Sequence, residues 1–279
     1  MNKKLIYYFY LTPDFKDNLA NRINLECLRR YARVFDSADI YLSLDDTGDD
    51  ALIREAEHEF VSMPFRGSLS FKIVRNTNFC ESKVIKEEIL DKVSEIEDLV
   101  FFAHAKGYTN IKTYSETIEN IQKWIVGCYF LSLEFINEVD SFIGDGGCPE
   151  ITYGSFPICA QHKISEDEFR NDYTSIFSGR IKYNWYFSGT FFWVNPLKMH
   201  NYINVFSPTL PKMEGRYFGE RMFGNIFRYY SNGMGHNSRV LYPCNFYNSG
   251  IVDASLEFIL EGDEHERFDK FYRSVISNV

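Results

Sequence analysis

A histidine and a lysine, His104 and Lys106, stand two residues apart directly after the apolar run LVFFA of residues 99–103. The run is typical of a buried β-strand, and Gly107 follows the pair where such a strand would end. Residues two apart on an extended chain point to the same side, so these two potentially cationic side chains are expected to act together. The spacing therefore predicts a site for an anionic ligand.

Three further strands are predicted before this one, over residues 5–11, 39–44 and 71–76. Helix-like patterns alternate with them, and no internal repeat or low-complexity linker interrupts the run. This alternation predicts an α/β fold, with a mostly parallel sheet and helices on both faces. With 279 residues and 45% hydrophobic content, the chain is long enough to bury the core of one large domain of this kind or of two closely joined ones.

Polar groups suited to a nucleotide follow each of the four predicted strands. In an open α/β sheet, ligands bind at the carboxyl ends of the strands. We expect the base and ribose of a donor to be held by Tyr10, Thr12 and Asp45, and its phosphates by Arg75, Asn76, Lys83, His104 and Lys106. Any one of these groups is a weak indication, because residues after strands are usually polar. Four groups in succession favour a nucleotide site.

The second half of the chain carries an aromatic strand pattern over residues 181–202. Glycine inside such a strand marks a place where a ligand or another backbone comes close. Alternation along the strand predicts that one set of rings is buried and that the other forms a platform for a sugar. The residues expected to contact an acceptor are Asp145, Trp185, Ser188, Gly189 and Trp193. For Asp145, which precedes two glycines, a simple turn role is the alternative.

Composition excludes several classes of protein. The formal net charge of −9, without a basic stripe, argues against a nucleic-acid partner. The six cysteines show no CxxC pair and no zinc-site spacing, which is typical of core residues in a reducing compartment. The N-terminal apolar run stops at Pro13 without a cleavage site, and the apolar run WIVGCYFLSL is too short for a membrane helix. A cytoplasmic location is expected.

The order of these parts resembles a GT-A glycosyltransferase, and more narrowly the small bacterial enzymes that build capsule and O-antigen polysaccharides. The resemblance rests on the turn HAKG, a following helix with Trp124, the strand SGTFFWVN and the helix motif ERMFGN, and it covers residues 4–248. It implies a single GT-A-like domain over residues 1–279. Within it, residues 1–112 would form the nucleotide-sugar-binding half and residues 113–279 the acceptor-binding half.

The sequence departs from this family at the end of the fourth strand. GT-A enzymes usually carry an Asp-x-Asp motif there, whose carboxylates hold Mn²⁺ or Mg²⁺ against the donor diphosphate. Here the same place reads His104-Ala105-Lys106. An imidazole and an ammonium would supply the positive charge in place of the metal, so no metal cofactor is expected. The alternative is a hydrogen-bonding histidine at a strand end and a solvated lysine in a turn.

The resemblance implies a hexosyltransferase that moves a hexose from a nucleotide sugar, a UDP-sugar in our expectation, to a hydroxyl of a glycan. Glu220 would be the catalytic base, with Glu214 and Asp145 as competitors. The alternative for Glu220 is an ion pair with Arg216 or Arg221 on its own helix.

The acceptor could be a lipid-linked glycan, in which case the enzyme would contact the inner face of the membrane peripherally. The C-terminal segment of residues 268–279 could be an amphipathic contact of this kind, although a packed terminal helix is favoured. Two other classes stay open. A non-catalytic glycan-binding protein would also be rich in aromatic residues, and a sugar-nucleotide nucleotidyltransferase or hydrolase would need clustered carboxylates for a metal.

Overall fold

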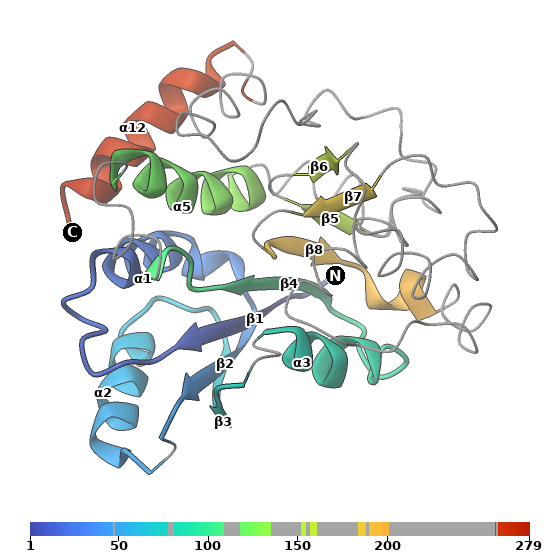
Figure 1. Ribbon diagram of the computed structural model, residues 1–279. Coiled ribbons are helices and arrows are strands. Elements are labelled where there is room, and N and C mark those ends of the chain that lie inside the picture. The colour runs from blue at the N-terminus through green and yellow to red at the C-terminus, as the bar shows by residue number, and fades with distance from the viewer. Residues whose placement is uncertain are drawn as a thin grey trace.

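The computed structural model describes residues 1–46, 48–77, 81–108, 118–134, 152–154, 157–160, 184–187, 190–200, 260 and 262–279, with the backbone alone for 152–154, 157–160 and 184–187. In these ranges the chain forms a six-stranded sheet in the order β3-β2-β1-β4-β8-β5 and a separate two-stranded sheet, β6-β7 (Figure 1). The predicted α/β fold class, a mostly parallel sheet flanked by helices, is confirmed.

Four parallel strands form the larger part of the sheet: β1 (Lys3–Tyr10), β2 (Ser37–Leu44), β3 (Ser68–Arg75) and β4 (Leu99–His104). Two short strands, β8 (Phe192–Val194) and β5 (Thr152–Gly154), add antiparallel pairs beyond β4. Every residue of β4 is buried, because this strand lies inside the sheet and helices cover both of its faces. The four strands predicted in the first half of the chain are all present, with ends that differ by a few residues.

The predicted aromatic strand is two strands in two different sheets. β7 (Asn184–Phe187) pairs with β6 (Pro157–Ala160), whereas β8 pairs with β4 and β5. The expectation of one continuous strand is therefore corrected. In the sequence, Ser188-Gly189 separates the two segments, and glycine is unfavourable inside a strand because it has no side chain to pack.

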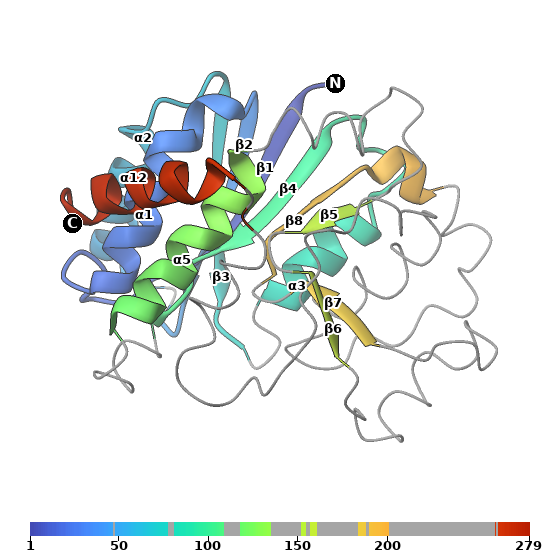
Figure 2. The same cartoon turned by 90° about the horizontal axis from the view of Figure 1, so that it is seen from above.

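Helices cover the sheet on two sides (Figures 1 and 2). One face carries α1 (Leu19–Tyr31), α2 (Asp50–Val61), α5 (Ile118–Leu133) and α12 (Glu264–Ile276), whose apolar side chains share one core with alternate residues of the strands. The opposite face carries α3 (Glu81–Ile85) and the π-helical turn η2 (Lys86–Leu90). The first core contains many packed aromatic rings, such as those of Phe101 and Trp193, whose centroids lie 4.9 Å apart.

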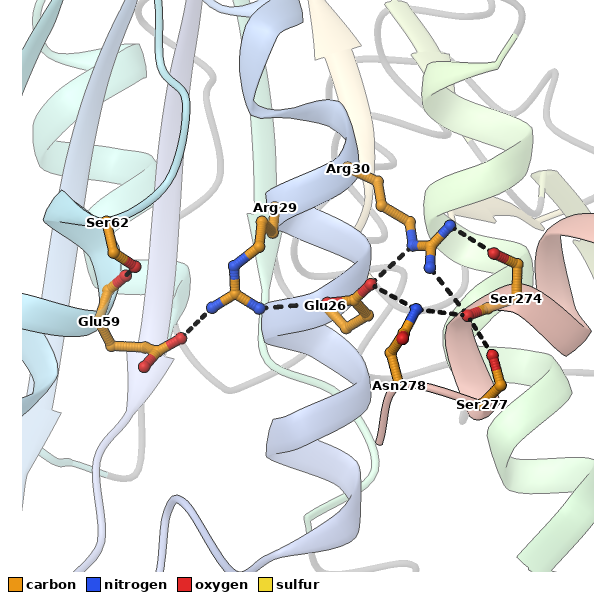
Figure 3. Close-up of polar contacts among 8 residues, drawn as sticks. All are labelled: Glu26, Arg29, Arg30, Glu59, Ser62, Ser274, Ser277 and Asn278. Carbon is orange, nitrogen blue, oxygen red and sulfur yellow. Dashed lines mark hydrogen bonds and ion pairs between the residues drawn. The ribbon is translucent and has the colours of Figure 1, made fainter.

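The C-terminal helix α12 is fixed to α1 by a set of polar contacts (Figure 3). Arg30 donates to the Ser274 hydroxyl at 2.7 Å and to the Ser274 carbonyl at 2.8 Å, and its Nε donates to Glu26 at 2.8 Å. The apolar side of the helix is buried, with Phe268 4% and Val275 0% exposed. The favoured prediction of a packed helix is confirmed, and this apolar side is not available as a membrane contact. No helix in the described ranges combines the length and the apolar character that crossing a membrane needs.

An ion-pair network on the α3 side predicts acid-dependent stability. Glu88 lies 3.0 Å from Lys72 and 2.6 Å from Lys92. Burial raises the pKa of this carboxyl, but hydrogen bonds from Lys92, Lys72 and Tyr41 outweigh it and lower the pKa to about 2. A lowered folded-state pKa stabilises the fold above the unfolded value and loses that contribution as the pH falls toward the folded value.

We expect Glu88→Gln to lower the free energy of unfolding at pH 7 by about 1 kcal/mol, a value discounted for solvent screening. The difference from the wild type should shrink between about pH 4.5 and about pH 2, which urea denaturation at several pH values measures. Glu87→Gln is the matched control, because the Glu87 carboxylate is exposed and lies 3.7 Å from Lys83. A destabilisation by Glu88→Gln that stays constant down to pH 2 would contradict the prediction.

Candidate functional site

The carboxyl ends of the four parallel strands meet at one edge of the sheet. Backbone bonds continue the pairing one residue past the strand ends: Leu11 N donates to Ser43 O at 2.8 Å, Asn76 N to Leu44 O at 2.7 Å, and Ala105 N to Tyr8 O at 3.0 Å. The residues that follow the strands are therefore held side by side. This edge is where open α/β sheets bind ligands.

Asp45 is the centre of a polar cluster at this edge. The Tyr10 hydroxyl donates to Oδ2 of Asp45 at 2.7 Å, and Nδ2 of Asn76 donates to Oδ1 at 2.9 Å. These two bonds lower the pKa of the Asp45 carboxyl, and the bond from Asn76 has the larger effect. The exposed group is therefore an anion at neutral pH. Behind it, the Tyr8 hydroxyl donates to Oδ1 of Asn76 at 3.3 Å and lies 2.6 Å from the Ser43 hydroxyl. We call Tyr10, Asp45 and Asn76 the Asp45 cluster.

A second cluster adjoins it after β1. Oδ1 of Asp14 accepts from the Thr12 hydroxyl at 2.7 Å and from the Tyr108 hydroxyl at 3.1 Å. The rings of Tyr10 and Tyr108 meet edge to face with centroids 5.7 Å apart. The structure thus brings together the predicted residues Tyr10, Thr12, Asp45 and Asn76, and it adds Asp14 and Tyr108, which the sequence did not single out.

His104 is buried at the end of β4, with 5% of its surface exposed. Its Nε2 lies 3.7 Å from Oε1 of Glu81, a distance that suits an ion pair when the imidazole is protonated. The same carboxylate oxygen accepts from the Thr190 hydroxyl at 3.3 Å. Thr190 has a φ of 56°, which strains a β-branched residue and is common near functional sites. Glu81 and Thr190 were not foreseen from the sequence.

Lys106 lies in the turn after β4, and its side chain takes a different direction from that of His104. Its Nζ lies 5.5 Å from the ring centroid of Trp124 in α5, whereas His104 contacts Glu81 in α3, on the opposite face of the sheet. The expectation that the two side chains point to the same side is therefore wrong. The reason is local: β4 ends at His104, and the chain turns at Gly107, where φ is +84°.

Two other predicted phosphate contacts, Arg75 and Lys83, are exposed. Arg75 lies at the end of β3, and Lys83 lies in α3, where its ammonium is 3.7 Å from Glu87. The contacts of the described residues do not join either one to the Asp45 cluster or to Lys106. Their role toward a phosphate stays a prediction.

Trp193 is fully buried, and its indole N–H donates to Ser132 O at 2.8 Å. Phe191 and Phe192, its neighbours, are also fully buried, one on each side of the strand, because helices cover both faces at this position. A sugar cannot stack on Trp193 in this arrangement, so the expectation of an acceptor contact is corrected for this residue. Of Trp185 only the backbone is described, in β7.

Several predicted residues lie outside the described part of the chain: Asp145, Ser188, Gly189, Glu214 and Glu220. Among the described residues, no group of three or more His, Cys, Asp or Glu side chains is placed to hold a metal ion.

No protein-family model matches the chain, and no curated protein gives a significant match. A solved structure, apo mouse xyloside xylosyltransferase 1, is similar at 12% sequence identity and a TM-score of 0.35, over 93% of this chain and 95% of that chain. A similarity at this level does not assign a function.

Proposed function

We propose that this chain is a glycosyltransferase that moves a hexose from a UDP-sugar to a hydroxyl of a glycan, and that it does so without a metal. One observation carries the proposal: the anionic Asp45 cluster and the cationic turn at Lys106 lie at the same carboxyl edge of a parallel sheet. These are the two kinds of group that the two ends of a nucleoside diphosphate require.

The nucleoside would bind at the Asp45 cluster. A carboxylate can accept hydrogen bonds from both hydroxyls of a ribose, and each oxygen of Asp45 has a second lone pair beside the one that Tyr10 or Asn76 occupies. The rings of Tyr10 and Tyr108 offer an apolar surface for the base next to this carboxylate. The Asp45 cluster therefore suits the ribose and the base but not a phosphate, which its charge would repel. Asn76, which the sequence predicted as a phosphate contact, is accordingly proposed for the ribose side, because its amide donates to Asp45.

The diphosphate would lie toward Lys106. As the acceptor oxygen attacks the anomeric carbon, the bond from that carbon to the phosphate oxygen breaks, and its electron pair remains on the leaving diphosphate. The Lys106 ammonium would stabilise this charge. In an inverting transfer, a carboxylate takes the proton of the acceptor hydroxyl, and we propose Glu220 for this role, with Glu214 and Asp145 as the competitors.

The acceptor that we propose is a surface polysaccharide or a lipid-linked glycan. Trp185, Ser188, Gly189 and Asp145 are the proposed acceptor contacts. A protein that uses a lipid-linked acceptor would work in the cytoplasm, against the inner face of the membrane.

A thermal-shift titration with UDP in excess EDTA tests the proposal. We expect UDP to raise the melting temperature by several degrees at concentrations far above its Kd, and EDTA to leave this shift unchanged. Asp45→Asn should weaken UDP binding about tenfold or more, because it removes the charge that the ribose hydroxyls would contact. Asp46→Asn is the matched control, since the adjacent exposed Asp46 accepts from Gly48 N at 3.0 Å and asparagine keeps that acceptor.

The other outcomes identify the alternatives. A shift that requires Mn²⁺ would support a metal-dependent nucleotide enzyme. Binding of oligosaccharides but of no nucleotide would support a non-catalytic glycan-binding protein. Release of sugar phosphate from a UDP-sugar, without transfer to any acceptor, would support a hydrolase.

A further inference from the structure

Asn24 lies in the middle of α1, and its side chain is fully buried. Asparagine is unfavourable inside a helix, because its amide competes for backbone hydrogen bonds, and a buried amide destabilises a fold unless its polar groups find partners. The position also falls on the apolar stripe of the helix, one turn after Ala20 and one turn before Leu28. A hydrocarbon side chain would fit this pattern, so the contacts of the amide must explain its presence.

All four hydrogen-bonding positions of the Asn24 amide are used. Its Nδ2 donates to Lys106 O at 2.8 Å and to Ala20 O at 2.7 Å. Its Oδ1 accepts from Lys106 N at 3.0 Å and from the Tyr129 hydroxyl at 3.1 Å. Because a backbone N–H only donates and a carbonyl only accepts, the two bonds to Lys106 fix which end of the amide is the oxygen.

The two bonds to Lys106 provide partners for its backbone just beyond the end of β4. Ala105 N still donates to Tyr8 O of β1, and at the next residue the Asn24 amide bonds both the N–H and the C=O, as a neighbouring strand would. Gly107 then turns the chain. The Asn24 amide thus holds the backbone of Lys106 in one place at the edge of the sheet.

Two buried tyrosines fix the amide in turn. The hydroxyl oxygens of Tyr129 in α5 and Tyr7 in β1 lie 2.7 Å apart, and both side chains are fully buried. Since Oδ1 of Asn24 only accepts, Tyr129 donates to it and must accept from Tyr7. Burial raises the pKa of both phenols, so this chain of donors stays protonated at neutral pH.

The far end of the Lys106 side chain is held by α5 as well. Its Nζ lies over the ring of Trp124, which is in the same helix as Tyr129. One helix therefore contributes to fixing both the backbone and the ammonium of this lysine. A lysine has a long, flexible side chain, and ordering it before the ligand arrives removes that cost from binding.

We infer that Asn24, Tyr129 and Tyr7 are positioning residues that hold the Lys106 ammonium ready for the diphosphate of the donor. This inference rests on the proposed function, because that function supplies the diphosphate. In this inference, a buried chain of hydrogen bonds runs from Tyr7 in β1 through Tyr129 in α5 to Asn24 in α1, and it places the Lys106 ammonium.

The test compares Tyr129→Phe with Tyr31→Phe. Tyr31 is a nearly buried tyrosine of α1 whose hydroxyl donates to Glu134 at 3.2 Å, so its replacement removes a similar bond away from Lys106. We expect Tyr129→Phe to weaken UDP binding about tenfold and to leave uridine binding unchanged, since only UDP carries the diphosphate. Tyr31→Phe should change neither affinity. An equal loss for UDP and uridine, or the same loss in Tyr31→Phe, would overturn the inference.

A double-mutant cycle tests whether the effect passes through Lys106. In a Lys106→Ala background, Tyr129→Phe is expected to weaken UDP binding less than about twofold further, because the group that it positions is gone. A full tenfold loss in that background would show that Tyr129 acts by another route and would contradict the inference.

Hydrogen exchange of the Lys106 amide needs no ligand and separates the two proposals. We expect Asn24→Ala and Tyr129→Phe to speed this exchange about tenfold or more, while the Leu5 amide in β1 stays slow. Unchanged exchange at Lys106 would refute the positioning role, whatever the protein binds. If exchange speeds up but the wild type binds no UDP, the proposed function fails and the hold on Lys106 stands.

Discussion

Replacement of Lys106 by alanine is expected to lower kcat/KM for sugar transfer about 10²-fold or more. The ammonium would face the charge that develops on the leaving diphosphate, and it is held beside Trp124 before the donor binds. Both a higher KM for the donor and a lower kcat are expected. The ammonium contributes to donor binding, and its interaction with the diphosphate becomes stronger as charge develops in the transition state. Steady-state measurement of UDP release, with the UDP-sugar that supports transfer, gives both constants.

Two further variants make this result specific. Lys106→Arg should recover part of the activity, because a guanidinium keeps the charge and stacks on an aromatic ring. Lys86→Ala is the matched control, since Lys86 is an exposed lysine whose ammonium lies 2.7 Å from Asp91 on the α3 side. A fully active Lys106→Ala enzyme would mean that the residue is only a turn lysine.

The parallel part of the fold was predictable because its signals are local. Each of the four parallel strands contains a short stretch rich in apolar residues, interrupted by Lys72 in β3, and polar residues follow where the strand ends. The Asp45 cluster follows from the same rule, because parallel strands place their carboxyl ends at one edge. The direction of Lys106 did not follow, since the two-residue alternation applies only while the chain stays extended, and β4 ends at His104.

The burial of the aromatic segment could not be predicted from the sequence, because the whole fold determines which faces of a strand are covered by other elements. Alternation predicted one exposed set of rings, but Phe192 and Trp193 are both buried because β8 lies between β4 and β5 and is covered on both faces. Buried strands of this kind read as continuous apolar runs. The segment FFWV of residues 191–194 contains no polar residue, and this was the feature of the sequence that indicated burial on both faces.

Two buried polar residues at the site depend on tertiary contacts. Glu81 stands at the start of a short helix, where a carboxylate is solvated by default, and only packing of α3 against the end of β4 brings it to His104. Asn24 did carry a signal, because an amide on the apolar stripe of a helix needs a buried partner. The sequence could reveal that need, but not that the partner is the backbone of Lys106, 82 residues away.

Replacement of Gly107 by alanine is expected to destabilise the fold by about 2–4 kcal/mol, the largest loss of stability that we predict. Two physical causes add. A residue with a Cβ is strained at the φ of +84° that Gly107 adopts, and the new Cβ would lie 2.6 Å from Cδ1 of Ile125, which is fully buried. Urea denaturation of the two proteins measures the difference.

A second substitution separates the two causes. Ile125→Val removes the Cδ1 atom that the new Cβ would meet, at a cost of about 0.5–1.5 kcal/mol in the wild-type background. In the Gly107→Ala background, the same change should cost less or even stabilise, because it relieves the overlap while the backbone strain remains. Equal effects of Ile125→Val in both backgrounds would mean that Ile125 does not restrict this position. An unchanged stability of Gly107→Ala would contradict the left-handed turn, and with it the present placement of Lys106.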